Sequence, residues 1–216
     1  MPTRPDRRSR ASHPPKGSVH TVTVEPSGGT ARPFAVLAVC TGNICRSPAV
    51  ERLLAAELGP DSGILVTSAG VGAMVDAAIP EPMASLLAEA GITPRDFYAR
   101  QLTESMIRDA DLVLALTRAH RSQIVSLHPG AVRRTFTLRE LARLARDIDP
   151  GEIPPGPPAA RLAALLSLAA AQRGQKFVEP SEDDVIDPYR GDESLYRRSF
   201  DQLHPAVREI ARMARG

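Results

Sequence analysis

The feature that most constrains the fold is an apolar segment that runs into a short loop and then a helix. Residues 34–39 are all apolar, a pattern typical of a strand buried on both faces of a parallel sheet. A mostly polar segment occupies positions 40–47, and from Pro48 onward apolar side chains recur at helical spacing until Gly59. Proline is tolerated in a first helical turn, so the helix begins close to Pro48. This order predicts a loop at the carboxyl end of a strand, where α/β proteins bind ligands.

The same alternation of strand and helix continues along the chain. Apolar runs predict further strands at 64–67, 111–116 and 132–136. Helical spacing and capping residues predict further helices at 82–90, from Thr103, at 118–127 and from Thr137. Glu140 lies three residues after Thr137, the spacing of a capping box. The sequence therefore predicts an α/β fold, with a central four-stranded parallel sheet flanked by helices and a ligand loop after the first strand.

The first part of the chain differs in composition from the rest. Residues 1–33 contain six basic and two acidic side chains and six of the 20 prolines, with few contiguous apolar residues. Such a segment cannot bury enough surface to offset its ordering entropy. We expect a disordered, basic, proline-rich tail at 1–33 and a folded domain at 34–216. The alternative for the tail is contact with acidic membrane or partner surfaces.

Charge and hydropathy exclude some classes of function. The whole chain of 216 residues has 27 basic and 25 acidic side chains, a net charge of +2, which argues against a protein that coats nucleic acid. No apolar run approaches the ~20 residues of a membrane-spanning helix. Two cysteines are too few for a disulfide-stapled secreted scaffold, which favours a cytoplasmic location. The five histidines show no metal-ligand spacing, so no metal site is expected.

A segment rich in proline and glycine interrupts the later part of the chain. Residues 150–158 contain five prolines and predict a stiff, extended linker. Leucines at 162, 165, 166 and 168 follow at helical spacing and predict an amphipathic helix that ends near Gly174. The whole insertion, roughly 147–182, is either a segment packed on the domain or a lid or partner-binding element.

The residues of the loop at 40–47 suit chemistry on a phosphate ester. A loop that enters a helix N-terminus directs backbone N–H groups into one concavity, and the helix dipole adds positive charge. Arg46 offers a planar fork for two phosphate oxygens. Helix dipole and arginine both favour a thiolate at Cys40, to which Ser47 can donate a hydrogen bond. The loop therefore predicts a cysteine nucleophile. The alternative is a small buried cysteine beside a solvated arginine.

The whole string from residue 39 to 48, together with Glu51, resembles the phosphate loop of the low-molecular-weight protein tyrosine phosphatases. That family carries an acidic residue in an Asp-Pro-aromatic motif near the C-terminus, and residues 187–189 match it. Residues 68–70 and 99–101 also resemble family landmarks, in the family's order. The resemblance covers roughly residues 34–213 and is strongest to the bacterial subgroup associated with exopolysaccharide control.

The resemblance implies a role for each matching residue. Cys40 would attack phosphorus and form a phosphocysteine intermediate, and Arg46 would bind the phosphate oxygens. Asp187 would first protonate the leaving group and then deprotonate the attacking water. If that assignment is displaced, Asp183 or Asp184 is the substitute. The phosphate would also be bound by the remaining loop residues, namely Thr41, Gly42, Asn43, Ile44, Cys45 and Ser47. No metal or other cofactor is implied.

The residues around the loop carry supporting roles and departures from the family. Asn43 and Ser68 would brace the loop, and Tyr189 would form one wall of a slot for an aromatic ring. Met74 lies where the family commonly has a tryptophan as the opposite wall. Phe97 replaces a common histidine, so the bracing network is expected to be weakened or rewired. Cys45 is either a packed small residue or the partner of Cys40 in a reversible protective disulfide.

The resemblance implies metal-independent hydrolysis of protein phosphotyrosine, with a bacterial tyrosine kinase among the candidate partners and phosphate or vanadate as competitive ligands. An arsenate reductase coupled to a small thiol is one alternative. A phosphoarginine phosphatase is a second, disfavoured because members with that preference carry threonine where Ile44 stands. A catalytically silent phosphate-binding module is a third, disfavoured by the presence of Cys40 and Asp187.

Overall fold

The computed structural model describes residues 32–175 and 178–216, so nearly all of the predicted tail lies outside the described residues. The described chain contains the expected four-stranded parallel sheet, with strand order β2-β1-β3-β4. The strands are β1 Phe34–Cys40, β2 Ile64–Gly70, β3 Leu112–Ala115 and β4 Thr135–Thr137. The helices are α1 Arg46–Leu58, α2 Glu81–Glu89, α3 Glu104–Asp109, α4 Arg118–Leu127, α5 Leu138–Arg146, α6 Pro158–Gln172 and α7 Glu193–Arg215.

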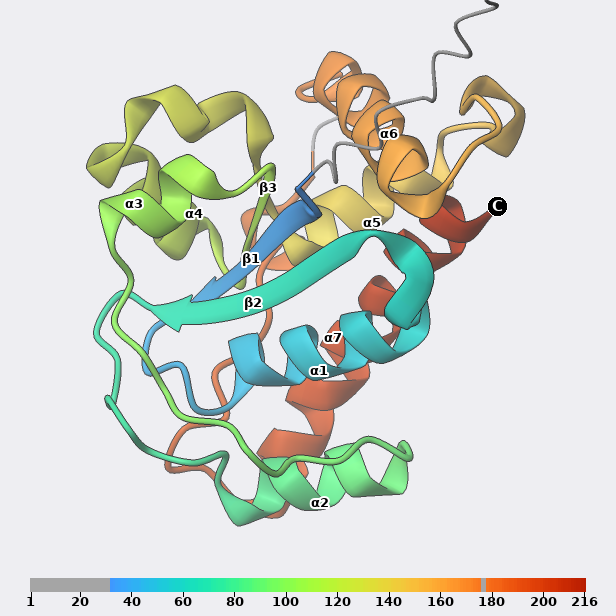
Figure 1. Cartoon of the computed structure of the whole chain (residues 1–216). Coiled ribbons are helices and arrows are strands. Elements are labelled where there is room, and N and C mark those ends of the chain that lie inside the picture. The colour runs from blue at the N-terminus through green and yellow to red at the C-terminus, as the bar shows by residue number, and fades with distance from the viewer. Residues whose placement is uncertain (1–31, 176–177) are drawn as a thin grey trace, which may run out of the picture. The chain divides into compact units, whose positions relative to one another are not determined.

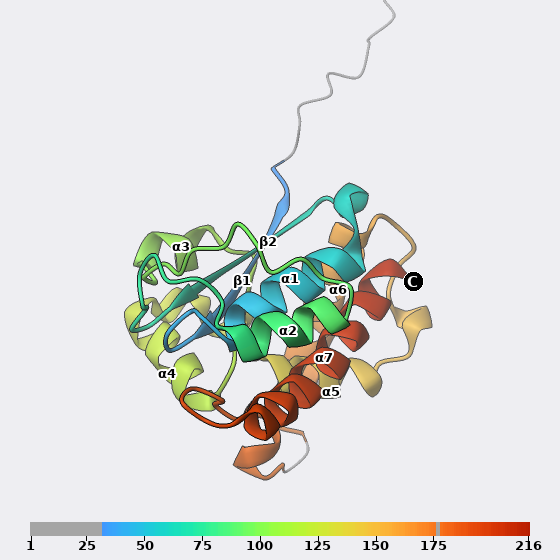
Figure 2. The same ribbon diagram turned by 90° about the horizontal axis from the view of Figure 1, so that it is seen from below.

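Helices cover both faces of the sheet, which explains the unbroken apolar sequence of β1. Alternate residues of β1 point to opposite faces. Val36 and Ala38 join a large core with α1, α5, α6 and α7, whereas Leu37 and Val39 join a smaller core with α3 and α4. Figures 1 and 2 show α3 and α4 on one side of the sheet and α1, α5 and α7 on the other. Every β1 residue from Val36 onward is therefore buried.

The sheet register brings the end of β1 close to the end of β2. Cys40, the last residue of β1, pairs with Gly70, the last residue of β2. A Cβ atom at Gly70 would collide with the carbonyl oxygen of Thr41, so glycine is required for the loop after β1 to pass this closely. Thr41 to Cys45 then lead directly into α1. The expected order of strand, loop and helix is confirmed.

The fourth strand was expected at 132–136 but spans only Thr135–Thr137. Residues Pro129–Arg134 form a 3₁₀ helix instead, because Pro129 starts a helical turn before the chain reaches the sheet. The capping box at the start of α5 is confirmed: the Thr137 side chain accepts from the backbone N–H of Glu140, and the Glu140 carboxylate accepts from the N–H of Thr137.

The longest helix, α7, was not predicted from the sequence. Its buried side chains, among them Tyr196, Phe200 and Leu203, recur at helical spacing, but Pro205 lies inside the pattern and normally marks a helix end. The helix is capped by Asp192, whose carboxylate accepts from the N–H of Leu195. It packs against α1, α5 and α6. These contacts offset the hydrogen bond that Pro205 cannot donate.

The inserted segment packs against the domain. Its apolar face on α6, including Leu162 and Leu165, is fully buried in the main core against α7. The Arg161 guanidinium donates to the carbonyls of Ile153 and Met213, which ties the segment to the end of α7. The expected extended linker instead begins with a 3₁₀ turn at Pro150–Glu152, and Ile153 after it is 2% exposed.

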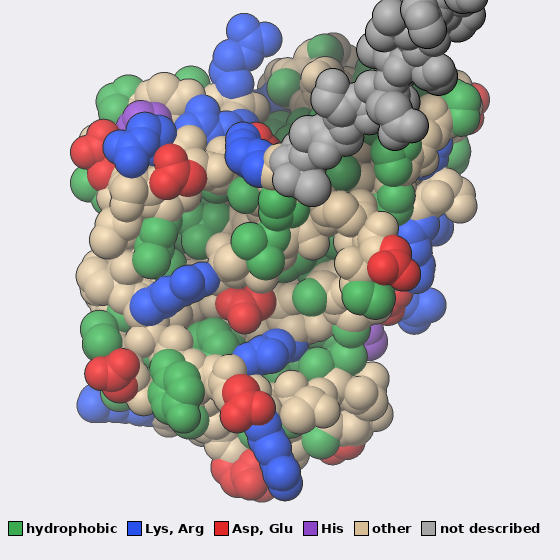
Figure 3. Space-filling model, in the orientation of Figure 1, with side chains coloured by type: hydrophobic (Ala, Val, Ile, Leu, Met, Phe, Trp, Pro, Cys, Tyr) green, Lys and Arg blue, Asp and Glu red, His purple; other side chains and the backbone are tan. Residues whose placement is uncertain are grey.

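The surface mixes the two signs of charge. On the face shown in Figure 3, basic and acidic side chains are interspersed among apolar ones, without a continuous basic patch. Among the helices of the described residues, none combines the length and the apolar character that crossing a membrane requires.

Candidate active site

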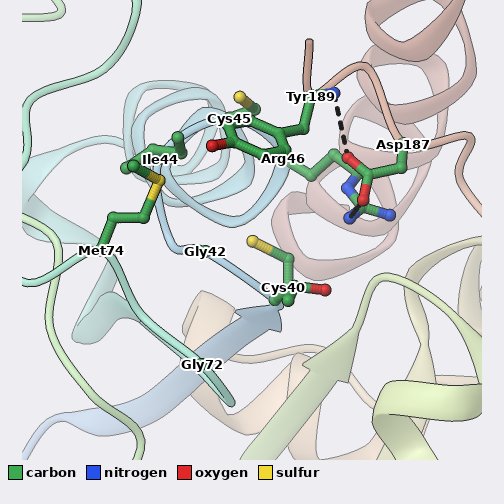
Figure 4. A pocket seen from close by; sticks show the side chains of 10 residues that line it. Cys40, Gly42, Ile44, Cys45, Arg46, Gly72, Met74, Asp187 and Tyr189 are labelled. Carbon is green, nitrogen blue, oxygen red and sulfur yellow. Dashed lines mark hydrogen bonds and ion pairs between the residues drawn. The ribbon is translucent and has the colours of Figure 1, made fainter.

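A pocket of about 210 Å³ opens at the carboxyl end of β1. Its lining comes from three segments of the chain: the loop after β1, the loop after β2 and the loop before α7. The lining residues are Cys40, Thr41, Gly42, Ile44, Cys45, Arg46, Gly72, Met74, Asp187 and Tyr189. Figure 4 shows the sulfur of Cys40 pointing into the space between Met74, Tyr189 and Arg46. The structure thus gathers most of the residues that the sequence marked, from positions up to 149 residues apart.

The thiol of Cys40 is held by a short chain of hydrogen bonds behind the pocket. Its Sγ lies 3.0 Å from the Oγ of Ser47, and that oxygen accepts a hydrogen bond of 2.9 Å from the Nδ2 of Asn43. Because Asn43 occupies the oxygen as a donor, the hydroxyl proton of Ser47 can point to the sulfur. Cys40 itself is 2% exposed and Ser47 is fully buried. Ser47 is therefore within hydrogen-bond distance of the sulfur, and its role in stabilising a thiolate stays a prediction.

Asn43 is the structural centre of the loop. Its φ of 52° lies in the left-handed region, which asparagine tolerates better than most residues. Its Oδ1 accepts from the backbone N–H of Arg100 at 2.9 Å, and its Nδ2 also donates to the Oγ of Ser68 at 2.9 Å. Ser68 in turn donates to the carboxylate of Glu51 at 2.7 Å. Asn43 and Ser68 therefore lie behind the pocket and brace its loop.

Phe97, at the position where a bracing histidine was the family expectation, is a buried core residue and 7% exposed. The carboxylate of Glu51 accepts from Ser68 and forms the acidic end of the bracing network in this chain. The guanidinium of Arg52 lies over the Phe97 ring, 5.9 Å from its centroid, and 3.9 Å from the Glu51 carboxylate. Whether this network differs from that of other family members stays a prediction.

The backbone of the loop is arranged to bind an anion. The carbonyls of residues 40–42 accept hydrogen bonds of 3.0 Å from N–H groups of residues 71–74. Within the described part of the chain, the N–H groups of residues 42–46 donate to no protein acceptor. Bonding the carbonyls on one side leaves these N–H groups at the start of α1 as donors for a ligand.

Arg46 supplies the cation of the pocket. Its side chain is only 4% exposed; Nη1 donates to the carbonyl of Val185 at 3.2 Å, and Nη2 lies 2.6 Å from Oδ2 of Asp187. Its buried Nε has no partner within the described residues. A buried guanidinium with an unpaired donor at the base of a pocket is a site for an anion.

The loop before α7, which we call the acid loop, places Asp187 at the pocket and its acidic neighbours elsewhere. Asp187 is half exposed, and its Oδ1 accepts from the N–H of Tyr189 at 3.2 Å. Asp183 instead pairs with Arg143 at 3.1 Å, and the Oδ1 of Asp184 accepts from the N–H of Arg118 at 2.7 Å. Neither lines the pocket, so the geometry favours Asp187 over both substitutes.

Two large side chains form the mouth of the pocket. Met74 and Tyr189 are each 44% exposed and both line the pocket. The side chain of Ile44, 7% exposed, lines the pocket next to Met74 (Figure 4). The guanidinium of Arg190 lies 5.1 Å from the centroid of the Tyr189 ring and supports its outer side. The mouth is therefore lined by apolar and aromatic groups above a polar base.

Cys45 differs chemically from Cys40 although both line the pocket. The Sγ of Cys45 lies 3.7 Å from the hydroxyl of Tyr196 on α7. Burial raises the pKa of the Cys45 thiol to about 11, so this thiol stays protonated near neutral pH. Cys45 is therefore unsuited to act as the nucleophile. Both cysteines are free thiols in the structure, and a disulfide between them stays a prediction.

The structure adds a residue that the sequence reasoning missed. His120 on α4 lies with its Nε2 2.9 Å from the Oγ1 of Thr41 in the phosphate loop. The histidines were judged in the sequence only for metal-ligand spacing, and within the described residues no cluster of three metal-ligating side chains occurs. The available signal was the position of His120 three residues after Thr117, a helix N-cap at the carboxyl end of a strand.

Comparison with known proteins agrees with this geometry. The sequence pattern of a family described as low molecular weight phosphotyrosine protein phosphatase matches residues 35–150, more than half of the chain. The chain belongs to this family. A probable low molecular weight protein-tyrosine-phosphatase, AmsI of Erwinia amylovora, is 41% identical over 102 residues, which cover 47% of this chain and 69% of the relative.

Two longer alignments extend the family match beyond residue 150. A protein-arginine-phosphatase of Geobacillus stearothermophilus is 30% identical over 179 residues, 83% of this chain and 95% of the relative. The crystal structure of the Erwinia amylovora tyrosine phosphatase AmsI superimposes with a TM-score of 0.60 at 25% identity, over 85% of this chain and 95% of that one. The cysteine-based phosphatase fold therefore includes the acid loop and α7.

Proposed function

We propose that this family member hydrolyses phosphotyrosine in proteins through a phosphocysteine intermediate, without a metal. The observation that carries the proposal is the convergence of three groups in one pocket. The Cys40 thiol, the Arg46 guanidinium and the Asp187 carboxyl all line it, with the N-terminus of α1 at its base. These are a nucleophile, an anion binder and an acid, the three parts that such a reaction needs.

The reaction proceeds in two steps. In the first, the Cys40 thiolate forms a bond to phosphorus while the bond from phosphorus to the tyrosine oxygen breaks, and Asp187 donates its proton to that oxygen. In the second, Asp187 accepts a proton from water as the water oxygen displaces the sulfur, which releases inorganic phosphate and restores the thiolate. Arg46 and the N–H groups of residues 42–46 stabilise the charge on the three equatorial oxygens in both steps.

The walls of the pocket favour an aromatic substrate. Tyr189 and Met74 present an aromatic face and a thioether on either side of the entry, and Ile44 adds an aliphatic surface. A flat phenyl ring packs favourably between such groups, which offer no strongly hydrated atoms that the ring would displace from water. Phosphoarginine is the second candidate, because a protein-arginine-phosphatase is among the relatives that align with more than four fifths of this chain. Its guanidinium would require polar acceptors, which Ile44 does not offer.

The test compares three substrates on three proteins. The wild type, Cys40→Ser and Asp187→Asn are assayed with p-nitrophenyl phosphate, a phosphotyrosine peptide and a phosphoarginine peptide. We expect phosphotyrosine to be preferred and Cys40→Ser to be inactive. Asp187→Asn should lose about 10²- to 10⁴-fold on phosphotyrosine and less on p-nitrophenyl phosphate, whose leaving group needs less help from an acid. Equal losses on both esters would remove Asp187 as the acid.

The same assays separate the remaining candidates. A wild type that turns over no ester but binds phosphate would be a silent phosphate-binding module, and turnover of arsenate with an added small thiol would indicate a reductase. Phosphate and vanadate should compete with the substrate. We further propose a reducing cytoplasmic location, in which the Cys40 thiol is preserved, and a tyrosine kinase as the enzyme that supplies the substrate.

The remaining assignments concern the parts outside the pocket. We propose that residues 1–33 act as a tail that takes no part in the pocket and is joined to the folded domain at 34–216 where Arg32 pairs with Asp111 at 2.7 Å, and that residues 147–182 are an integral part of that domain. Deletion of the tail should leave kcat and KM unchanged. Amide exchange of the insertion should be equally slow with and without vanadate, whereas protection that appears only with vanadate would identify a lid.

A further inference from the structure

The segment that leads into the first turn of α4 contacts two of the three loops that line the pocket. The N–H of Leu116, just before the helix, donates to the carbonyl of Val39 at the end of β1, and the carbonyl of Leu116 accepts from the N–H of Val185 in the acid loop, each at 2.9 Å. The N–H of Arg118 donates to the Asp184 carboxylate in the same loop at 2.7 Å. Residues 116–120 therefore connect the phosphate loop at 40–47 to the acid loop before α7, and we call this segment the joint.

His120 is the side chain of this joint that reaches the phosphate loop. It is 6% exposed, and both ring nitrogens are hydrogen-bonded. Nε2 lies 2.9 Å from the Oγ1 of Thr41, and Nδ1 lies 2.9 Å from the Oγ1 of Thr117, the N-cap of α4. Burial, with a smaller contribution from nearby Arg46, lowers the pKa of His120 to about 4, so the ring is neutral at physiological pH.

The hydrogen bond from His120 matters because of where Thr41 lies in the loop. Thr41 follows the nucleophile Cys40, is exposed and lines the pocket. The other side-chain braces of the loop run from Asn43 to Arg100, Ser68 and Ser47. The hydrogen bond to His120 instead acts on the side chain of Thr41, the residue next to Cys40. A displacement of about 1 Å in a reacting group can cost a hundred-fold in rate, so a brace at this point matters.

We propose that His120 is a positioning residue that fixes Thr41, and with it the Cys40 side of the phosphate loop, to the first turn of α4. Asp184 fixes the acid loop to the same turn, so this turn sets the separation between the thiol and the general acid. The proposal rests on the proposed function for its kinetic readout, but the contact itself can be tested without catalysis.

A pair of substitutions isolates the contact to Thr41. A glutamine amide nitrogen reaches about as far as a histidine Nε2, and an asparagine amide reaches about as far as Nδ1. His120→Gln therefore keeps the bond to Thr41, whereas His120→Asn keeps only the bond to Thr117. We expect His120→Gln to stay within about three-fold of wild type, and His120→Asn to lose about ten- to a hundred-fold in kcat/KM, with weaker binding of inorganic phosphate. Equal activity and equal phosphate binding in the two variants would overturn the proposal.

A double-mutant cycle with Thr41→Val gives a second measurement. Valine is similar in shape to threonine but lacks the hydroxyl, so it removes the same hydrogen bond from the other side. Thr41→Val should lose about as much as His120→Asn, and the double variant should lose little more than either, because coupled residues are not additive. Losses that multiply would mean that the two residues act separately and would contradict the proposal.

The control is His128→Gln, at the C-terminal end of the same helix, where the ring pairs with Glu104 and is remote from the pocket. It should leave kcat and phosphate binding unchanged. Backbone amide NMR shifts of residues 41–47 provide the readout that does not depend on activity. His120→Asn should shift these resonances and His120→Gln should not. If the wild type fails to hydrolyse phosphotyrosine, the proposed function is wrong, while these shifts still decide the role of His120.

Asp184 provides the test on the acid side of the joint. Asp184→Asn keeps an oxygen that can accept from the Arg118 N–H, whereas Asp184→Ala removes it. Asp184→Ala should lose several-fold more on a phosphotyrosine peptide than on p-nitrophenyl phosphate, because displacement of the acid loop weakens proton donation by Asp187. Asp184→Asn should stay close to wild type. Identical losses on both esters in Asp184→Ala would show that the turn does not set the position of the acid.

Discussion

The two loops that meet at the pocket are built in different ways. The phosphate loop places its functional groups within eight consecutive residues, 40–47, and its geometry follows from a strand end, a left-handed Asn43 and a helix start. The acid loop has little regular structure, and distant side chains hold it. Arg139 donates to the carbonyls of Ser181 and Asp184, and Gln202 accepts from the N–H of Ile186. A local sequence can encode the first loop, whereas only the assembled fold can define the second.

Arg46 connects the two loops, and its replacement should have the largest effect on activity. The guanidinium contacts the acid loop at Val185 and Asp187 from within the phosphate loop. Arg46→Lys keeps the charge but loses the planar fork and its several donors. We expect a loss of about a thousand-fold in kcat/KM on a phosphotyrosine peptide, with weakened phosphate binding. Loss of less than about ten-fold would mean that charge alone suffices and that the fork is not used.

Asn43 tests how far the phosphate loop depends on local conformation. Asn43→Ala removes hydrogen bonds to Ser47, Ser68 and the Arg100 N–H and strains a left-handed backbone, so unfolding free energy should fall by about 1 to 3 kcal/mol. Activity should fall by about ten- to a hundred-fold. Asn43→Gly is the matched control, because glycine keeps the backbone conformation and loses only the hydrogen bonds. Chemical denaturation and kcat measure the two parts. Equal values for both variants would assign the whole effect to the hydrogen bonds.

Arg139 tests the dependence of the acid loop on distant contacts. Arg139→Met preserves the aliphatic stem and removes the donors to Ser181 and Asp184. The acid loop should become more mobile, and kcat should fall by about ten-fold on phosphotyrosine with a smaller change on p-nitrophenyl phosphate. The control is Arg146→Met, an exposed arginine of the same helix. If Arg139→Met lowers the activity on both substrates equally, the substitution acts on general stability and not on proton donation by Asp187.

The same contrast explains what the sequence could predict. The sheet, β1 and the loop that leads into α1 follow from contiguous residues with clear periodicity, and the bracing position of Asn43 is what the family resemblance implies. The motif at Asp187 predicts its place at the pocket, but the clamp of Arg139 has no such signal, because it joins residues more than 40 positions apart whose proximity depends on α5 packing. The helix α7 was missed because Pro205 interrupts its pattern, and tertiary packing overrides that local signal.

The titration of His120 supplies a prediction on stability alone, with no change in catalysis at neutral pH. Its pKa is lowered from 6.5 to about 4 by burial, so the unfolded chain binds a proton over this interval and the folded chain does not. The folded state is therefore unaffected above pH 6.5, loses stability as the pH falls, and reaches the full loss below pH 4. At 1.36 kcal/mol per pH unit, the interval from 6.5 to about 4 corresponds to a full loss of about 3 kcal/mol. Glutamine does not titrate in this range, so His120→Gln lacks this loss. Between pH 7 and pH 4 the unfolding free energy of the wild type should therefore fall by that amount relative to the variant. A constant difference over this range would mean that the folded protein protonates His120 as readily as the unfolded chain does, and that the ring is not enclosed between Thr41 and Thr117.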